Sequence, residues 1–77
     1  MKNMISLNKR QLKNLEAIRK KHQMMRLDLV EAIKENPDNK IQNNIYRHQI
    51  LQIDKDIQRI DTSIRSCKQT IQSLTFK

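Results

Sequence analysis

The spacing of apolar residues in the second half of the chain is the feature that most constrains its fold. From Tyr46 to Leu74 an apolar residue recurs at alternating intervals of four and three, which is the spacing of a helix that packs against another helix along a narrow seam. One core position is occupied by isoleucine throughout, and the other is more varied. The two sets are Ile50, Ile57, Ile64 and Ile71, and Tyr46, Ile53, Ile60, Cys67 and Leu74.

The chain has one clear break, the segment Asn36-Pro37-Asp38-Asn39, and it has no Gly and no other Pro. Pro37 cannot continue a helix but suits the first turn of a new one, and Asn36 can cap that turn. We therefore predict one domain of two helices, about 6–35 and about 40–75, with a turn at about 36–39.

The first half of the chain carries a weaker seam. It consists of Leu15, Ile18, His22, Met25, Leu29 and Ala32, extended toward the start through Leu12, Leu7 and Ile5. A turn this short makes the helices antiparallel, so facing residues have numbers that sum to about 75. Met25 then faces Ile50, Ile18 faces Ile57, Leu15 faces Ile60, and Asn8 lies near Cys67. The predicted fold is an all-α antiparallel two-helix coiled-coil hairpin.

Near the turn, apolar residues also occupy positions outside the seam. A helix that is apolar on several sides is normally covered on several sides, and a chain this short rarely supplies a sufficient core alone. We expect the hairpin to be completed by dimerisation into a four-helix bundle or by a protein partner, with the chain acting as an adaptor or co-chaperone. The predicted protein interface is Met24, Leu27, Val30, Ile33, Ile45 and Leu51.

The half of the hairpin nearest the termini is basic instead. The chain has 16 Lys and Arg against 8 Asp and Glu, an excess that attracts phosphates. The alternative function is therefore a small dimeric regulator that binds nucleic acid, although one Tyr and one Phe leave little aromatic surface for stacking on bases. Its predicted contacts are Lys9, Arg10, Lys13, Arg19, Lys20 and Lys21.

The residues that could carry catalysis all have simpler interpretations. His22 falls on the seam opposite about Ile53 and His48 on the outer face, so the two cannot share a metal ion. Cys67 is interpreted as a small core residue. Asp54 and Asp61 are expected to form solvated ion pairs with neighbours on their own helix, namely Lys55, Arg59 and Arg65, and Glu16 is expected to pair with Lys20. We predict no enzymatic activity, catalytic residue, cofactor, metal or small-molecule substrate.

The longest apolar runs are pairs such as Met24-Met25, far short of the ~20 residues of a membrane span. An isolated Cys67 is compatible with a reducing compartment. We expect a cytoplasmic protein that does not bind membranes.

The second helix resembles that of the small helical-hairpin co-chaperones of type III secretion needle proteins. In that family the second helix opens soon after a turn with an aliphatic–aromatic pair, followed by a seam with an acidic residue. Ile45-Tyr46 is similar to that pair and Ile53-Asp54 to the start of that seam, which continues through Ile57 and Ile60. The resemblance covers about residues 15–65. It implies a cytoplasmic protein that shields a self-polymerising secretion subunit together with a second, helical-repeat chaperone.

Overall fold

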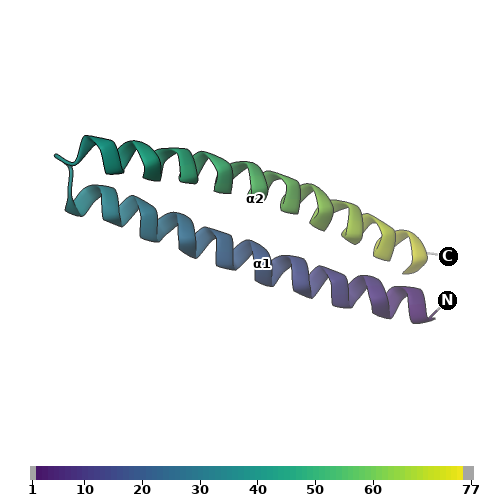
Figure 1. Ribbon diagram of the computed structural model, residues 1–77. Coiled ribbons are helices and arrows are strands. Elements are labelled where there is room, and N and C mark those ends of the chain that lie inside the picture. Colours follow the sequence, from purple (N-terminus) through teal and green to yellow (C-terminus); the bar gives the residue numbers. More distant parts are fainter. Residues whose placement is uncertain (1, 76–77) are drawn as a thin grey trace.

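The computed structural model describes residues 2–75, which form two helices, α1 (Lys2–Glu35) and α2 (Lys40–Thr75), and no strand. The helices fold back on each other into a rod of 58 × 14 × 13 Å, with both termini at one end (Figure 1). The predicted antiparallel hairpin is confirmed. α1 begins four residues earlier than expected, because no residue in this first stretch breaks a helix.

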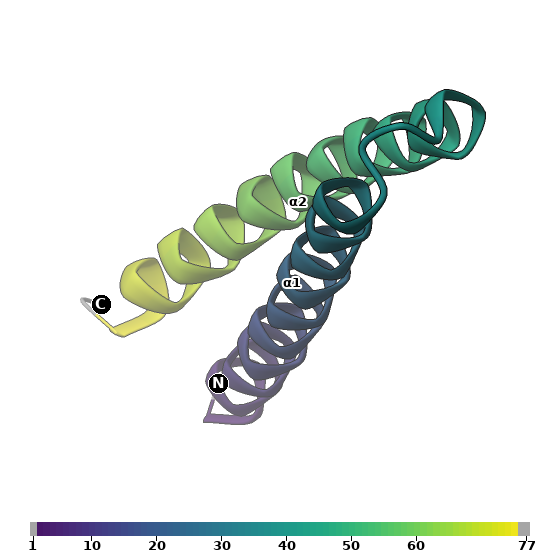
Figure 2. The same cartoon turned by 90° about the vertical axis from the view of Figure 1, so that its left-hand side faces the viewer.

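The two helices are inclined to each other and not strictly parallel (Figure 2), as in coiled coils. Their core is thin. Among the described residues, the buried apolar side chains are Ile53, Ile64 and Cys67. The Cys67 thiol donates to the Asn8 carbonyl oxygen, with Sγ and O 3.1 Å apart. This contact confirms the predicted proximity of these two residues and fixes the register of the hairpin.

The turn corrects one prediction, because Asn39 and not Asn36 caps the second helix. The Asn39 Oδ1 accepts from the Gln42 amide at 3.3 Å, and its carbonyl accepts the first helical bond, from the Asn43 amide, at 2.9 Å. Pro37 belongs to the turn before the helix, and the Asn36 carbonyl accepts from the Asn39 amide. No residue of 2–75 has a positive φ. The turn therefore contains no left-handed backbone position of the kind that favours glycine.

Asn43 is a buried polar residue that the sequence analysis missed. It is 3% exposed, and its Nδ2 donates to the carbonyl oxygens of Asn36 at 2.8 Å and Pro37 at 3.4 Å. It stands seven residues before Ile50 and therefore occupies the same heptad position as Ile50 and Ile57. The side chain therefore begins the α2 seam and ties α2 to the turn, while its Oδ1 has no hydrogen-bond partner within the described residues.

Candidate protein-interaction surfaces

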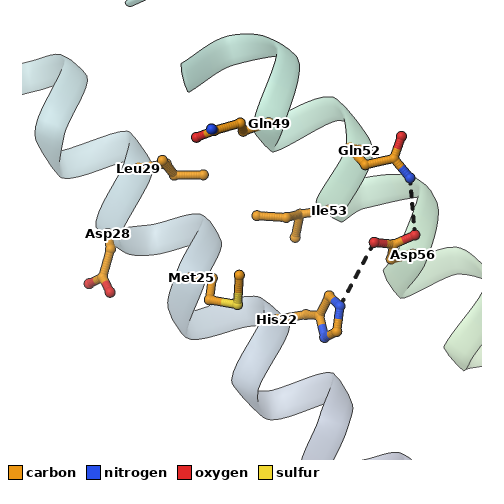
Figure 3. Close-up of a pocket in the computed structure, with 8 residues that line it drawn as sticks. All are labelled: His22, Met25, Asp28, Leu29, Gln49, Gln52, Ile53 and Asp56. Carbon is orange, nitrogen blue, oxygen red and sulfur yellow. Dashed lines mark hydrogen bonds and ion pairs between the residues drawn. The ribbon is translucent and has the colours of Figure 1, made fainter. Parts of the chain in front are cut away.

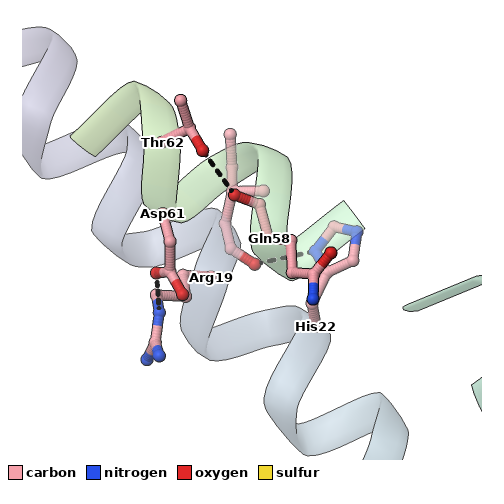
Figure 4. A network of polar contacts seen from close by, with 6 residues as sticks. Arg19, His22, Gln58, Asp61 and Thr62 are labelled. Carbon is pink, nitrogen blue, oxygen red and sulfur yellow. Dashed lines mark hydrogen bonds and ion pairs between the residues drawn. The ribbon is translucent and has the colours of Figure 1, made fainter. Parts of the chain in front are cut away.

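Two Arg–Asp pairs cross between the helices in the middle of the rod. Arg26 Nε lies 2.7 Å from Asp54 Oδ1, and Arg19 pairs with Asp61 in the same way. The arginines are seven residues apart on α1 and the aspartates seven apart on α2, so the two pairs repeat with the heptad. Figure 4 shows the Arg19–Asp61 pair. The expectation that these aspartates pair along their own helix was wrong, because seam arginines reach them from α1.

These pairs also correct the phase of the predicted α1 seam. Leu15, His22 and Leu29 are half-buried as expected, but Ile18 and Met25 are 44% and 45% exposed. The seam instead takes the next residue along the chain at both places, Arg19 and Arg26. The half-buried heptad series of α1 is Ile5, Asn8, Leu12, Leu15, Arg19, His22, Arg26, Leu29 and Ile33. Leu7, which the sequence predicts in the seam, is 61% exposed and lies outside it.

An open hollow of about 520 Å³ lies between the helices beside His22. Met25, Leu29 and Ile53 point toward one another across it, and Asp28 is directed away (Figure 3). The predicted placement of His22 opposite Ile53 is confirmed, since both line this hollow. His22 Nδ1 lies 2.9 Å from the Ile18 carbonyl oxygen, and its Nε2 lies 3.8 Å from Asp56 Oδ2, an ion pair when the imidazole is protonated.

A second hollow of about 350 Å³ repeats the first one two heptads further toward the termini. On α2 the larger hollow is lined by 49, 52, 53 and 56 and the smaller by 63, 66, 67 and 70, each shifted by fourteen residues. On α1, Asn8 and Gln11 likewise stand fourteen residues before His22 and Met25. Because the same heptad positions line both, the two hollows open on one side of the rod. We call this side the groove face.

The Arg–Asp pairs lie on the opposite side of the seam. Asp54 and Asp61 each follow a core isoleucine of α2, whereas the hollow-lining Asp56 and Ser63 each precede one. Residues directly before and directly after a core position flank a helical seam on opposite sides. The hairpin thus has a groove face, which carries the two hollows, and an ion-paired face, across which the two Arg–Asp pairs lie.

The predicted interface residues are partly exposed and do not all share one side. Four of them are exposed, namely Met24, Leu27, Ile45 and Leu51, while Val30 and Ile33 are half-buried. Leu27 and Leu51, 60% and 58% exposed, occupy heptad positions next to the ion-paired face. Ile45 stands seven residues before Gln52 and therefore belongs to the groove face. Ile41, 80% exposed, adds to the apolar surface near the turn.

The predicted nucleic-acid contacts lie in the strongly basic half of the rod. Residues 1–26 and 57–77 contain twelve Lys and Arg and two acids, against four and six in residues 27–56. Arg19 is half-buried and forms an ion pair with Asp61. The other five are exposed and form no ion pair within the described residues, namely Lys9, Arg10, Lys13, Lys20 and Lys21.

Across residues 2–75, no three His, Cys, Asp or Glu side chains gather as they would around a metal ion. In the same residues, neither helix has a stretch apolar and long enough to cross a membrane. No protein-family model, curated protein or solved structure matches the chain.

Proposed function

We propose that this chain is a non-enzymatic protein-interaction module that binds an amphipathic helix of a partner through the apolar surface near its turn. The observation that supports this proposal is the balance of apolar burial and exposure. The described hairpin buries three apolar side chains, while Met24, Leu27, Leu51 and Ile41 are each more than half exposed near the turn. Exposed apolar side chains gathered near one end of a small protein are typical of interaction sites.

The charged residues around Leu27 and Leu51 are of both signs. Lys20 and Lys34 stand seven residues before and after Leu27 and therefore on its stripe of α1. Arg47 and Lys55 stand four residues before and after Leu51 and flank it on α2. Glu31 stands four residues after Leu27 and Asp54 three residues after Leu51, so the patch matches a partner whose apolar stripe is bordered by charges of both signs.

The adaptor or co-chaperone role is one form of this proposal. A secretion subunit that polymerises through helices would offer such a stripe, which the chain would cover until secretion. This form rests on the resemblance at Ile45-Tyr46 and Ile53-Asp54, and the wider proposal does not depend on it.

The test is capture of the partner from cells that contain the protein, with the wild type and two double variants as bait. We expect one protein, equimolar with the bait, to survive nuclease and about 0.5 M NaCl, because apolar docking weakens little with salt whereas phosphate contacts weaken steeply. L27D/L51D should lose it, because each Asp places a charge in the apolar contact. The matched control K9Q/K13Q should retain it.

The captured protein is then purified and titrated calorimetrically with the same three baits, and circular dichroism verifies that each bait is helical. Binding that L27D/L51D leaves unchanged would contradict the proposal. So would the absence of any stoichiometric protein partner.

A second candidate function uses the basic half of the rod. The five unpaired cations Lys9, Arg10, Lys13, Lys20 and Lys21 favour it, since phosphate contacts made by Lys and Arg supply most of non-specific nucleic-acid affinity. Retained material that disappears with nuclease, and that K9Q/K13Q loses while L27D/L51D keeps it, would support this function instead.

A further inference from the structure

We infer that the groove face is the contact surface of an antiparallel two-fold dimer, in which Ile18 of one chain meets Ile18 of a second copy. This surface is distinct from the patch around Leu27 and Leu51, so the inference does not depend on the proposed partner. It rests on three observations: the two repeated hollows, the exposed apolar side chains beside them, and the charges of the face.

The charges of the groove face allow a second copy to approach. The stripes that line the hollows carry few charged residues, and these nearly cancel: Lys21, Asp28, Glu35, Asp56 and Arg59. Of these five, Asp28 and Asp56 line the larger hollow, and the remaining residues that line the two hollows are apolar side chains, Asn, Gln, Ser, Thr and His22. Since the whole chain has a formal charge of +8, two copies repel each other over most of their surface. The nearly neutral groove face is where that repulsion is weakest.

The spacing on α1 is symmetric about Ile18. Gln11, which lines the smaller hollow, stands seven residues before it, and Met25, which lines the larger hollow, stands seven residues after it. An antiparallel two-fold axis at Ile18 therefore places the larger hollow of each chain over the smaller hollow of the other. The exposed Met25 side chain of one copy then enters the smaller hollow of the second copy.

Leu7 and Leu29 are a second pair of residues that the two-fold axis at Ile18 brings together. Leu7 stands eleven residues before Ile18, and Leu29 stands eleven residues after it. The two-fold axis therefore brings the exposed Leu7 of one chain to the Leu29 end of the larger hollow in the other. That hollow is lined by Leu29, Met25 and Ile53, so an apolar side chain that is otherwise in water finds an apolar site.

The charges on α2 agree with this register. The Asn8–Cys67 contact places Ile18 level with about residue 57 of α2, since each lies ten residues along its helix from that contact. Arg59 of one chain then faces residues 55 and 56 of the other, where Asp56 lines the larger hollow and Lys55, which flanks Leu51, does not. Opposite charges thus meet on both sides of the axis.

The first experiment measures the mass in solution by light scattering as concentration rises through the micromolar range. We expect the mass to rise from 9.3 kDa toward twice that value. I18R, which brings two like charges together at the axis, should be monomeric at every concentration. The matched control L27R, which changes an equally apolar and more exposed side chain on the other side of the rod, should dimerise like the wild type.

The second experiment oxidises single-cysteine variants made in a C67S background. A residue on a two-fold axis meets its own copy, so I18C should form a disulfide-linked dimer rapidly while L27C does not. Circular dichroism establishes that each variant is helical. A wild-type mass of 9.3 kDa throughout the range would overturn the inference, and so would cross-linking of L27C as fast as that of I18C. Neither result bears on whether Leu27 and Leu51 bind a different protein.

Discussion

Replacing Ile53 with Ala should destabilise the hairpin far more than the same replacement at Ile41. Ile53 is 6% exposed in the seam, whereas Ile41 is 80% exposed on the outer face of the same helix. The substitution removes three carbons, which at about 0.8 kcal/mol each gives about 2.4 kcal/mol for Ile53. Its site borders the larger hollow, so little closed cavity is left behind, and we expect a loss of about 2–3 kcal/mol, at the lower end for buried isoleucine.

Ile41→Ala is the matched control. Its stability should stay within about 0.5 kcal/mol of the wild type, because the side chain buries little and Ala is a slightly better helix former. The propensity gain is common to both variants, so the difference between them measures burial at Ile53. Urea unfolding is followed by far-UV circular dichroism at one fixed protein concentration, since self-association shifts apparent stability. Equal losses in the two variants, or a larger loss for I41A, would refute the described seam.

The cap and the buried amide at the turn lead to two further predictions, both measured by thermal unfolding at equal concentration. N39A should lose about 1 kcal/mol because it removes the side-chain acceptor of the Gln42 amide, whereas N36A should lose a few tenths, because the acceptor at that residue is the backbone carbonyl. If N36A lost more than N39A, the cap would be misplaced. N43D should lose more than about 2 kcal/mol, since it replaces a buried donor to two carbonyl oxygens with a carboxylate. An N43D variant as stable as the wild type would contradict the hydrogen bonding at the turn.

The α2 seam could be predicted from the sequence because its core positions are apolar almost without interruption. The α1 seam could not be predicted by the same criterion, since three of its central positions are Arg19, His22 and Arg26. A search for apolar residues selects the neighbours Ile18 and Met25 and shifts the seam by one residue. The signal for the correct phase is electrostatic: Arg19 and Arg26 have the same seven-residue spacing as Asp54 and Asp61.

The candidate surfaces, too, could be predicted from the sequence only in part. The exposure of Met24, Leu27 and Leu51 could be predicted because they fall outside either seam. The groove face could not, because its hollows depend on which residues of α1 enter the seam, and that depends on the ion pairs. Asn43 could not be predicted as a core residue, because a polar residue at a heptad position normally ends the seam. Here its side-chain amide is buried and donates to the carbonyl oxygens of Asn36 and Pro37.

The contact between Asn8 and Cys67 tests the central claim, which is that the helices fold back in one register from which both surfaces follow. Asn8→Cys places a second thiol where the Cys67 Sγ now lies 3.1 Å from the Asn8 carbonyl oxygen and 3.7 Å from its Oδ1. We predict that dilute N8C oxidises to a disulfide within one chain and unfolds at a higher temperature. Leu7→Cys, one residue away and directed outward, should not close. Closure of L7C as readily as N8C, or disulfides only between chains, would contradict this register and the surfaces derived from it.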